Sequence, residues 1–323
     1  MSVLKTGDLK VPTQLFEPWV KRIHDGSAIS TLSGAVPMKF GKGEAFSFDI
    51  GEAEYVGEGS QKGPSKFTQT SQTYEPFKFH KTVRWTEEVQ WADEDHQMGV
   101  VQEILNLIQP ALSRALDFGV IHGVNPASGQ TVSAMTQKLV STENEVEFGA
   151  DDRVGDVVDE ATGLLLDGGG VPDGIAVDPK FAAAITRTRL VDANGNRAQK
   201  MYPEFSFRSS ESQFDGLSAA TARTVGAGGV IDPATGLLAV VGDFSAVRWG
   251  IQKSIGLEVI KYGDPDGQGD LKRNNEVAFR AEVVYGWGIA ELDRNFAKIV
   301  SADGGDDGND GGDDGNDGGD TGE

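Results

Sequence analysis

An alternating strand that leads directly into one long helix constrains this fold more than any other feature of the sequence. Residues 77–85 place Phe77, Phe79, Val83 and Trp85 opposite Lys78, His80, Thr82 and Arg84, the period of two that a half-buried strand requires. In the next segment apolar residues recur at spacings of three and four, at Met98, Val101, Ile104, Leu105, Ile108, Leu112, Ala115 and Leu116. This stripe predicts a helix with one buried face.

The ends of that helix are marked by capping and breaking residues. Asp93 or Asp95 is expected to cap its N-terminus, because a carboxylate accepts bonds from the free amides of the first turn. Pro110 is expected to bend the helix, and Gly119 or Gly123 to end it.

A second strand, over 45–50, pairs naturally with the first. Phe46, Phe48 and Ile50 alternate with polar residues there, and the intervening residues 51–76 are rich in Gly, Ser, Thr and Gln. Connections of that length are uncommon in compact domains and are usually functional or disordered. We predict a long hairpin that projects from the body; because a lone hairpin cannot bury both faces, it should dock on a partner chain. The candidate inter-subunit contacts are Lys62, Lys66, Phe67 and Tyr74. The alternative is an unstructured surface loop.

The remaining segments mix helices and strands. Periodicity predicts a helix over 154–166, a strand over 175–177 and a helix that begins at Pro179 with Asp178 as its cap. Strands are expected at 237–242, 246–251, 255–260 and 277–300, whereas 192–235 is rich in loops and has no clear assignment. Strands that look antiparallel, with helices segregated from them, predict an α+β fold.

Composition narrows the classes of function. The net charge is −21, and residues 303–323 hold nine acidic and no basic residues, which predicts a disordered acidic Gly/Asp tail. An acidic body argues against general nucleic-acid binding, which depends on Lys and Arg, although a wall that encloses DNA is compatible with it. There is no cysteine and no apolar run of the roughly 18–20 residues that a membrane helix needs.

Motifs that carry chemistry are missing from the sequence. We find no P-loop, GxGxxG, HExxH or GxSxG pattern, and the four histidines lack metal-ligand spacing. The segments 192–196 and 264–268 begin like calcium loops but lack the bidentate glutamate, so we interpret both as turns. We therefore expect no enzymatic activity, no catalytic site, no metal and no cofactor.

Six short motifs together resemble one known family. In order they are AEYVGEGS at 53–60, the strand and turn at 77–88, LDFGVIHG at 116–123, DGIAVDPKF at 173–181, VGDF at 241–244, and VAFRAE at 277–282 with YGWG at 285–288. Each motif alone is weak, but their order over residues 1–302 is similar to that of the major capsid proteins of tailed bacteriophages, which have the Hong Kong 97-type capsid fold.

The resemblance implies a domain plan and a function. It implies an N-terminal arm (1–36), an extended β-hairpin loop (37–85), a peripheral domain with the spine helix (86–150 and 272–302) and an axial domain (151–271), followed by the acidic tail (303–323). Copies of the chain would form hexamers and pentamers of an icosahedral phage head that encloses double-stranded DNA without sequence-specific binding. Portal, scaffolding and decoration proteins are the other implied partners. The resemblance also implies that the protein is part of the virion, that it assembles in the cytoplasm of the bacterial host, and that it has no membrane partner.

Two alternatives stay open at this point. An encapsulin-like cellular nanocompartment shares the fold and encloses an enzyme instead of a genome. An ordinary α+β enzyme with a long loop would need a convergent polar site, which the sequence does not reveal.

Overall fold

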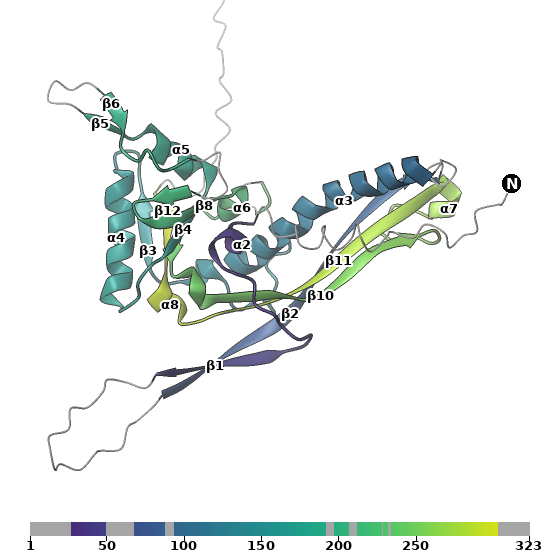
Figure 1. The fold of residues 1–323 in the computed structure, drawn as a ribbon, viewed down its shortest axis with the longest axis horizontal. Helices are drawn as coiled ribbons and strands as arrows, with labels where there is room; N and C mark the ends of the chain where they lie inside the picture. Colours follow the sequence, from purple (N-terminus) through teal and green to yellow (C-terminus); the bar gives the residue numbers. More distant parts are fainter. Residues whose placement is uncertain are drawn as a thin grey trace, which may run out of the picture.

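The described residues form two large β-sheets, a two-stranded sheet and one long helix (Figure 1). The computed structural model describes residues 27–49, 68–87, 94–191, 197–206, 212–227, 229–231 and 234–302. Within these residues no helix is long and apolar enough to cross a membrane. The mixture of helices and sheets agrees with the expected class.

The elongated half of the molecule is a four-stranded antiparallel sheet with the order β1-β2-β11-β10. Its strands are β1 (Gly43–Asp49), β2 (Thr68–Thr86), β10 (Val247–Ile260) and β11 (Glu276–Ile289). The long helix α3 (Glu94–Asp117) runs beside this sheet (Figure 1). It continues as a π-helical turn over Phe118–His122, which ends at Gly123 in the left-handed conformation, a conformation that glycine adopts without strain.

The compact half is a six-stranded sheet with the order β3-β12-β9-β4-β8-β7, in which β3 and β12 run parallel, as do β4 and β8. Its strands are β3 (Glu145–Phe148), β4 (Gly174–Val177), β7 (Ser212–Phe214), β8 (Leu217–Thr221), β9 (Leu237–Gly242) and β12 (Phe296–Ser301). The helices α4 (Val154–Asp167) and α5 (Pro179–Arg187) share one hydrophobic cluster with this sheet. The shorter α2 (Ala28–Leu32) and α6 (Arg223–Gly226) contribute to the other cluster.

Strand alternation explains this layering. In β4 and β9, Ile175, Val177 and Val241 belong to the cluster with α4 and α5, whereas Ala176 and Val240 belong to the cluster with α2 and α6. Successive side chains of a strand point to opposite faces, so both faces of the sheet are covered. Smaller elements complete the chain: β5 (Arg189–Val191), β6 (Arg197–Lys200), α7 (Leu271–Asn274) and α8 (Leu292–Asn295), with 3-10 turns at Leu139–Ser141 and Phe244–Ala246.

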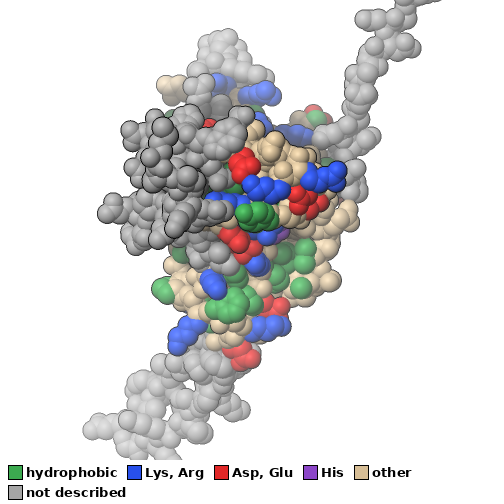
Figure 2. Space-filling view, turned by 90° about the vertical axis from the view of Figure 1, so that its right-hand side faces the viewer, with side chains coloured by type: hydrophobic (Ala, Val, Ile, Leu, Met, Phe, Trp, Pro, Cys, Tyr) green, Lys and Arg blue, Asp and Glu red, His purple; other side chains and the backbone are tan. Residues whose placement is uncertain are grey.

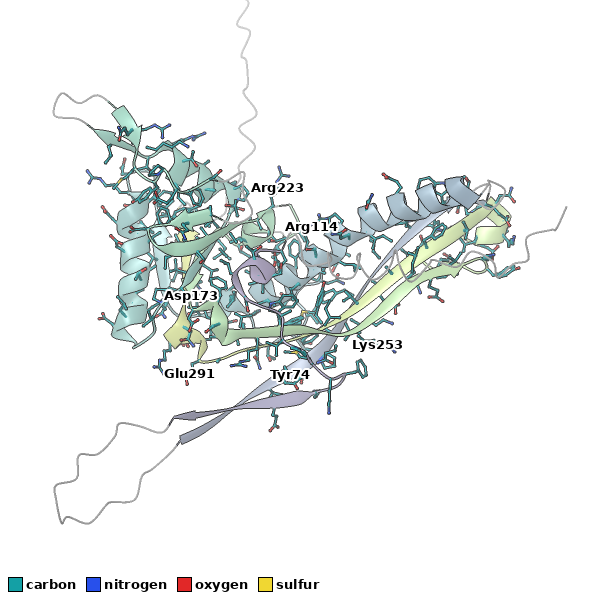
Figure 3. The ribbon with its side chains drawn as sticks, in the orientation of Figure 1. Tyr74, Arg114, Asp173, Arg223, Lys253 and Glu291 are labelled. Atoms are coloured by element: carbon teal, nitrogen blue, oxygen red, sulfur yellow. The ribbon has the colours of Figure 1, made fainter. Side chains whose placement is uncertain are left out.

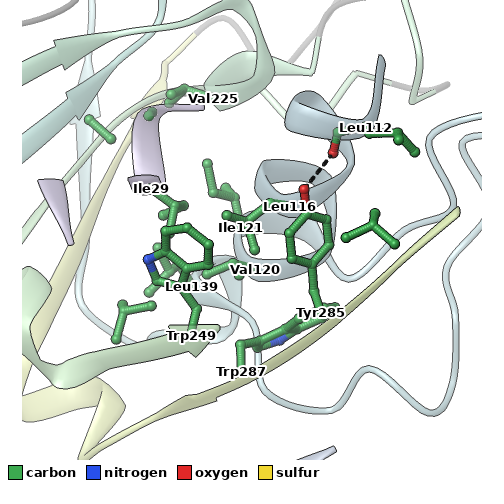
Figure 4. Close-up of a cluster of buried hydrophobic side chains, with 14 of the residues drawn as sticks. Ile29, Leu112, Leu116, Val120, Ile121, Leu139, Val225, Trp249, Tyr285 and Trp287 are labelled. Carbon is green, nitrogen blue, oxygen red and sulfur yellow. Dashed lines mark hydrogen bonds between the residues drawn. The ribbon is translucent and has the colours of Figure 1, made fainter. Parts of the chain in front are cut away.

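Three large aromatic side chains join the helix α3 to the long sheet (Figure 4). Trp249, Tyr285 and Trp287 are each at most 2 % exposed, yet each polar group has a partner, as buried Tyr and Trp require. The Tyr285 hydroxyl donates to the Leu112 carbonyl at 3.1 Å, Trp249 Nε1 to the Ser33 carbonyl at 2.9 Å and Trp287 Nε1 to the Gln137 carbonyl at 3.1 Å.

Several sequence predictions are confirmed here. The structure contains the two helices expected over 154–166 and from Pro179, and the strands expected over 45–50, 175–177 and 237–242. The Asp178 cap is also present, because Asp178 Oδ1 accepts a hydrogen bond from the Lys180 amide at 2.8 Å. The segment 264–268, interpreted as a turn, lies in the irregular connection between β10 and α7.

Other predictions need correction. Residues 277–300 are two strands in different sheets, β11 and β12, separated by α8, and 246–251 with 255–260 are one strand, β10, that carries register shifts. The expected end of the long helix at Gly123 is confirmed, with Gly119 inside the helical path, and α3 contains Pro110. Asp95 lies inside α3 and does not cap it. Asp93, the segment 192–196 and the tail 303–323 lie outside the described residues.

Candidate assembly surfaces

The arm formed by β1 and the first part of β2 is a two-stranded ribbon. Residues 43–49 pair with 68–74 in continuous antiparallel register, from Gly43↔Tyr74 to Asp49↔Thr68. Figure 1 shows this ribbon leaving the long sheet and pointing away from both halves of the molecule. Beyond it, residues 75–86 of β2 pair with β11, so a single strand connects the arm to the body.

Tyr74 lies at the root of this arm (Figure 3). Its ring covers Gly43, where a Cβ would clash with the phenol, and the side chain is half-buried. Lys42 and Glu75 form an ion pair at the same level. Of the four candidate contact residues, only Tyr74 is described; Lys62, Lys66 and Phe67 lie outside the described residues.

The chain that leads into the arm crosses the sheet over two glycines. Gly250 and Gly286 are cross-strand partners on β10 and β11, and a Cβ at Gly250 would clash with the Val36 carbonyl, while one at Gly286 would lie 3.1 Å from Met38 Sδ. Gln252 fixes the crossing by two bonds to the Gly41 backbone, at 2.8 and 3.0 Å. The arm is therefore held at its root by the body of its own subunit.

The side chain of Gln137 holds the base of the arm from the other side. Its Nε2 donates to the Thr73 carbonyl at 2.7 Å, and its Oε1 accepts from the Ile289 amide at 2.7 Å. One side chain thus connects β2, β11 and the loop after α3, so the direction of the arm is fixed where it begins.

A buried carboxylate joins the N-terminal segment to the end of α3. Asp117 accepts hydrogen bonds from the Ser27 and Thr224 hydroxyls and from the Ala28 and Ile29 amides, the latter two at 3.0 and 3.2 Å. Burial raises the pKa of Asp117 above its ordinary value, and the four hydrogen bonds oppose that rise. The amides are those of the first turn of α2, so the negative charge also compensates the positive end of that short helix.

At the far end of the long sheet, one arginine gathers three carboxylates. Arg84 on β2 contacts Asp266 through two nitrogens, with Nε 2.9 Å from both Asp266 oxygens, and lies 3.0 Å from Asp264 and from Glu276. Its hydrogen bond holds the pKa of Asp266 below the usual range. The two aspartates of the 264–268 segment thus bind the guanidinium of Arg84. Figure 2 views this end of the molecule, where acidic and basic side chains are intermixed.

A groove of about 540 Å³ opens between β2 and the C-terminal half of α3. Its lining combines apolar residues such as Phe77, Phe79 and Phe118 with the basic Lys81 and Arg114, and none of the described lining residues is a carboxylate. Neither the groove nor any other described part of the chain has a cluster of three or more residues that could hold a metal ion. The groove is chemically suited to an apolar segment with acidic residues.

The sequence predicted the hairpin and singled out Asp117, but it did not reveal the residues that contact them. The Asp117 partners Ser27 and Thr224 are 90 and 107 positions away, so no local pattern could reveal them. The Gly-Trp-Gly pattern around Trp287 was the available signal for the crossing at Gly286, because glycine in a strand often marks a close backbone approach.

Comparisons with known proteins were made at three levels. No protein-family model and no curated protein matches the chain. Solved structures do match: a chain from Mycobacterium phage Ogopogo is 40% identical, with 86% of this chain and 92% of that chain covered and a TM-score of 0.72. A Gordonia phage Cozz chain is 27% identical over 86% and 87%, with a TM-score of 0.68.

A more distant match extends the similarity of fold. A structure described as the capsid of an empty GTA particle computed with C5 symmetry is 12% identical, covers 94% of both chains and has a TM-score of 0.54. At that identity only the fold is shared. Because a phage chain matches with 40% identity over 86% of this chain, this protein belongs to the major capsid proteins of bacteriophages, the subunits that form the phage shell.

Proposed function

We propose that the chain has the Hong Kong 97-type capsid fold and builds an icosahedral head shell, from hexamers and pentamers, around double-stranded phage DNA. Sheet membership supports a division in which the six-stranded sheet with α4 and α5 is the axial domain. The four-stranded sheet with α3 is the peripheral domain, and β1 with the first part of β2 is the extended loop. In this proposal β3 and β12 belong to the axial side and β10 to the peripheral side, which refines the boundaries expected from the sequence.

The observation that best supports the proposal is the arm of β1 and β2, which is held by the body of its subunit at one end and projects from it at the other. A two-stranded ribbon is at best marginally stable alone, yet this one is fixed at its root by Gln137 and Gln252. A fixed arm of this kind gains stability when it packs on a neighbouring copy. We propose that its tip docks in the neighbour's groove between β2 and α3. Residues 52–58 (EAEYVGE) offer three glutamates and Tyr55, which complement the basic rim and apolar floor of that groove.

The remaining partners follow from the same role. We propose a structural role without enzymatic activity, with a portal and a separate scaffolding protein as partners during assembly in the bacterial cytoplasm, and with decoration proteins as partners of the finished shell. The acidic body suits a wall that encloses DNA without binding it tightly. The phage and GTA structures named above give the encapsulin alternative no specific support.

Removing the arm's tip tests this role directly. Because Asp49 and Thr68 are paired in the register, residues 50–67 can be replaced by Asn-Gly, the turn favoured in two-residue hairpins. The variant should give a folded subunit with the melting temperature of the unassembled wild type, but no stable shells by electron microscopy. Normal shells from this variant would refute the arm's role. A second variant, Lys81→Glu with Arg114→Glu, tests the groove and is expected to show the same defect.

A further inference from the structure

The β5–β6 hairpin carries basic side chains and exposed apolar side chains. Arg189 and Lys200 are paired across the hairpin, and like charges in that position destabilise it. Arg189 Nη1 donates to the Thr186 carbonyl at 2.8 Å, but neither residue forms an ion pair within the described part of the chain. Leu190 and Met201 are 48% and 45% exposed. Figure 1 shows the hairpin projecting beyond α5 at one corner of the compact half.

The helix α4 has the opposite charge. It contains Asp156, Asp159, Glu160 and Asp167, all exposed, and no basic residue. Acidic residues three and four positions apart repel each other on a helix, and Asp167 adds a negative charge at the negative end of the helix dipole. No ion pair relieves these charges among the residues that the structure describes.

Two further observations mark the α4 face as a binding surface. Leu164 and Leu166 are 39% and 54% exposed beside the acidic residues. Burial first, and then the nearby carboxylates Asp215, Asp159 and Asp156, raise the pKa of Tyr202, whose hydroxyl packs against Gly155 in the first turn of α4. The α4 face and the hairpin thus match each other in charge, and both expose aliphatic side chains.

We propose that the α4 face of one copy binds the β5–β6 hairpin of the next copy within a ring of capsid subunits. This inference rests on the proposed function and names the surfaces that make its ring contact. The two surfaces differ, so the contact is head-to-tail, and such contacts close into rings when the rotation permits. Because the attraction is between exposed charges, ring formation weakens as salt concentration rises.

Charge reversal on each side, and on both together, tests the contact. The hairpin variant carries Arg189→Glu with Lys200→Glu, the helix variant carries Asp159→Lys with Glu160→Lys, and the combined variant carries all four. Each is expressed at full length under the conditions in which wild type assembles, and assembled particles are measured by sedimentation and electron microscopy. We expect each two-residue variant to lose about tenfold or more of the assembled fraction, because juxtaposed like charges oppose docking. The combined variant restores assembly close to the wild-type level.

The design separates local pairing from overall charge. The hairpin and helix variants shift the net charge by equal amounts in opposite directions, so an effect of overall charge alone would spare one of them. A milder pair, Arg189→Gln with Lys200→Gln, should give an intermediate yield with reduced salt dependence, and melting curves of unassembled subunits establish that each variant folds.

Four results would overturn the inference. Normal assembly of both reversed variants, or a folded combined variant that is not rescued, would exclude the contact while leaving the shell function intact. A hairpin variant that forms normal shells with less DNA would show that the hairpin faces the genome. Absence of any assembly by wild type would instead refute the proposed function, and this inference with it.

Discussion

Asp117 is the residue on which three segments of the chain converge. Its two oxygens accept four hydrogen bonds, from the hydroxyls of Ser27 and Thr224 and from the first two amides of α2. A carboxylate is an acceptor at both oxygens, which suits four donors. The entry of the N-terminal segment, the end of α3 and α6 are consequently fixed to one another by a single side chain.

Asp117→Asn is expected to destabilise the unassembled subunit by about 1–3 kcal/mol. The substituted amide keeps the volume but turns one acceptor into a donor, which leaves a buried amide of α2 without its partner. The measurement is denaturant unfolding of unassembled subunits. Asp151→Asn is the matched control, because Asp151 is exposed and should change stability by less than about 0.5 kcal/mol; an equal effect of both substitutions would contradict the assigned role.

Because His122 is buried, we expect the free energy of unfolding of the subunit to decrease in acid. Its Nε2 donates to the Thr224 carbonyl at 2.9 Å, its Nδ1 has no partner among the described residues, and burial lowers its pKa from 6.5. Below pH 6.5 the unfolded chain therefore binds a proton that the folded chain does not bind, and stability falls with decreasing pH by at most about 1.4 kcal/mol per pH unit.

The test compares His122→Gln with His80→Gln, an exposed histidine on β2. Unfolding free energies measured from pH 7 to pH 5 should lose part of their slope only when His122 is replaced. An unchanged slope in His122→Gln would contradict this assignment.

At the scale of helices and strands, sequence periodicity identified the elements whose buried residues recur at regular spacing. The helices α4 and α5 and the strand β9 follow their apolar patterns, because each packs one clear face or is buried on both. The first part of β2, Thr68–Tyr74, was missed because its sequence is polar; it is a strand because β1 pairs with it, and such pairing overrides local propensity. The break within 277–300 was missed because apolar strands lie on both sides of the short helix α8, and the sheet that each strand joins is set by partners elsewhere in the chain.

At Gly119, helix propensity and tertiary packing have opposite effects on the stability of an alanine substitution. Helix propensity alone favours alanine over glycine by about 1 kcal/mol, but a Cβ at Gly119 would lie 2.6 Å from Trp287 Cη2. We expect Gly119→Ala to destabilise the subunit by about 1–3 kcal/mol through overpacking. Gly163→Ala in α4, where a Cβ has open space, should be stabilising. Thermal unfolding of unassembled subunits measures both, and a stabilised Gly119→Ala variant would show that this close contact is not tight.

At the scale of the whole molecule, the sequence was sufficient for the family and the hairpin but not for the surfaces. Motif order predicted a capsid subunit, and a phage chain of 40% identity agrees. The arm's root at Gln137 and the Arg84 cluster depend on segments that are distant in sequence. Such contacts leave no periodic signal, because they follow from which elements the fold brings side by side.

The most direct measurement of the central claim is electron microscopy of the purified full-length protein, alone and coexpressed with neighbouring scaffold gene products. A shell subunit is expected to give closed shells, capsomer rings or tubes in at least one of these preparations. Sedimentation of the same samples should show large assemblies that dissociate into folded subunits. A uniformly monomeric or dimeric protein in every preparation would contradict the account.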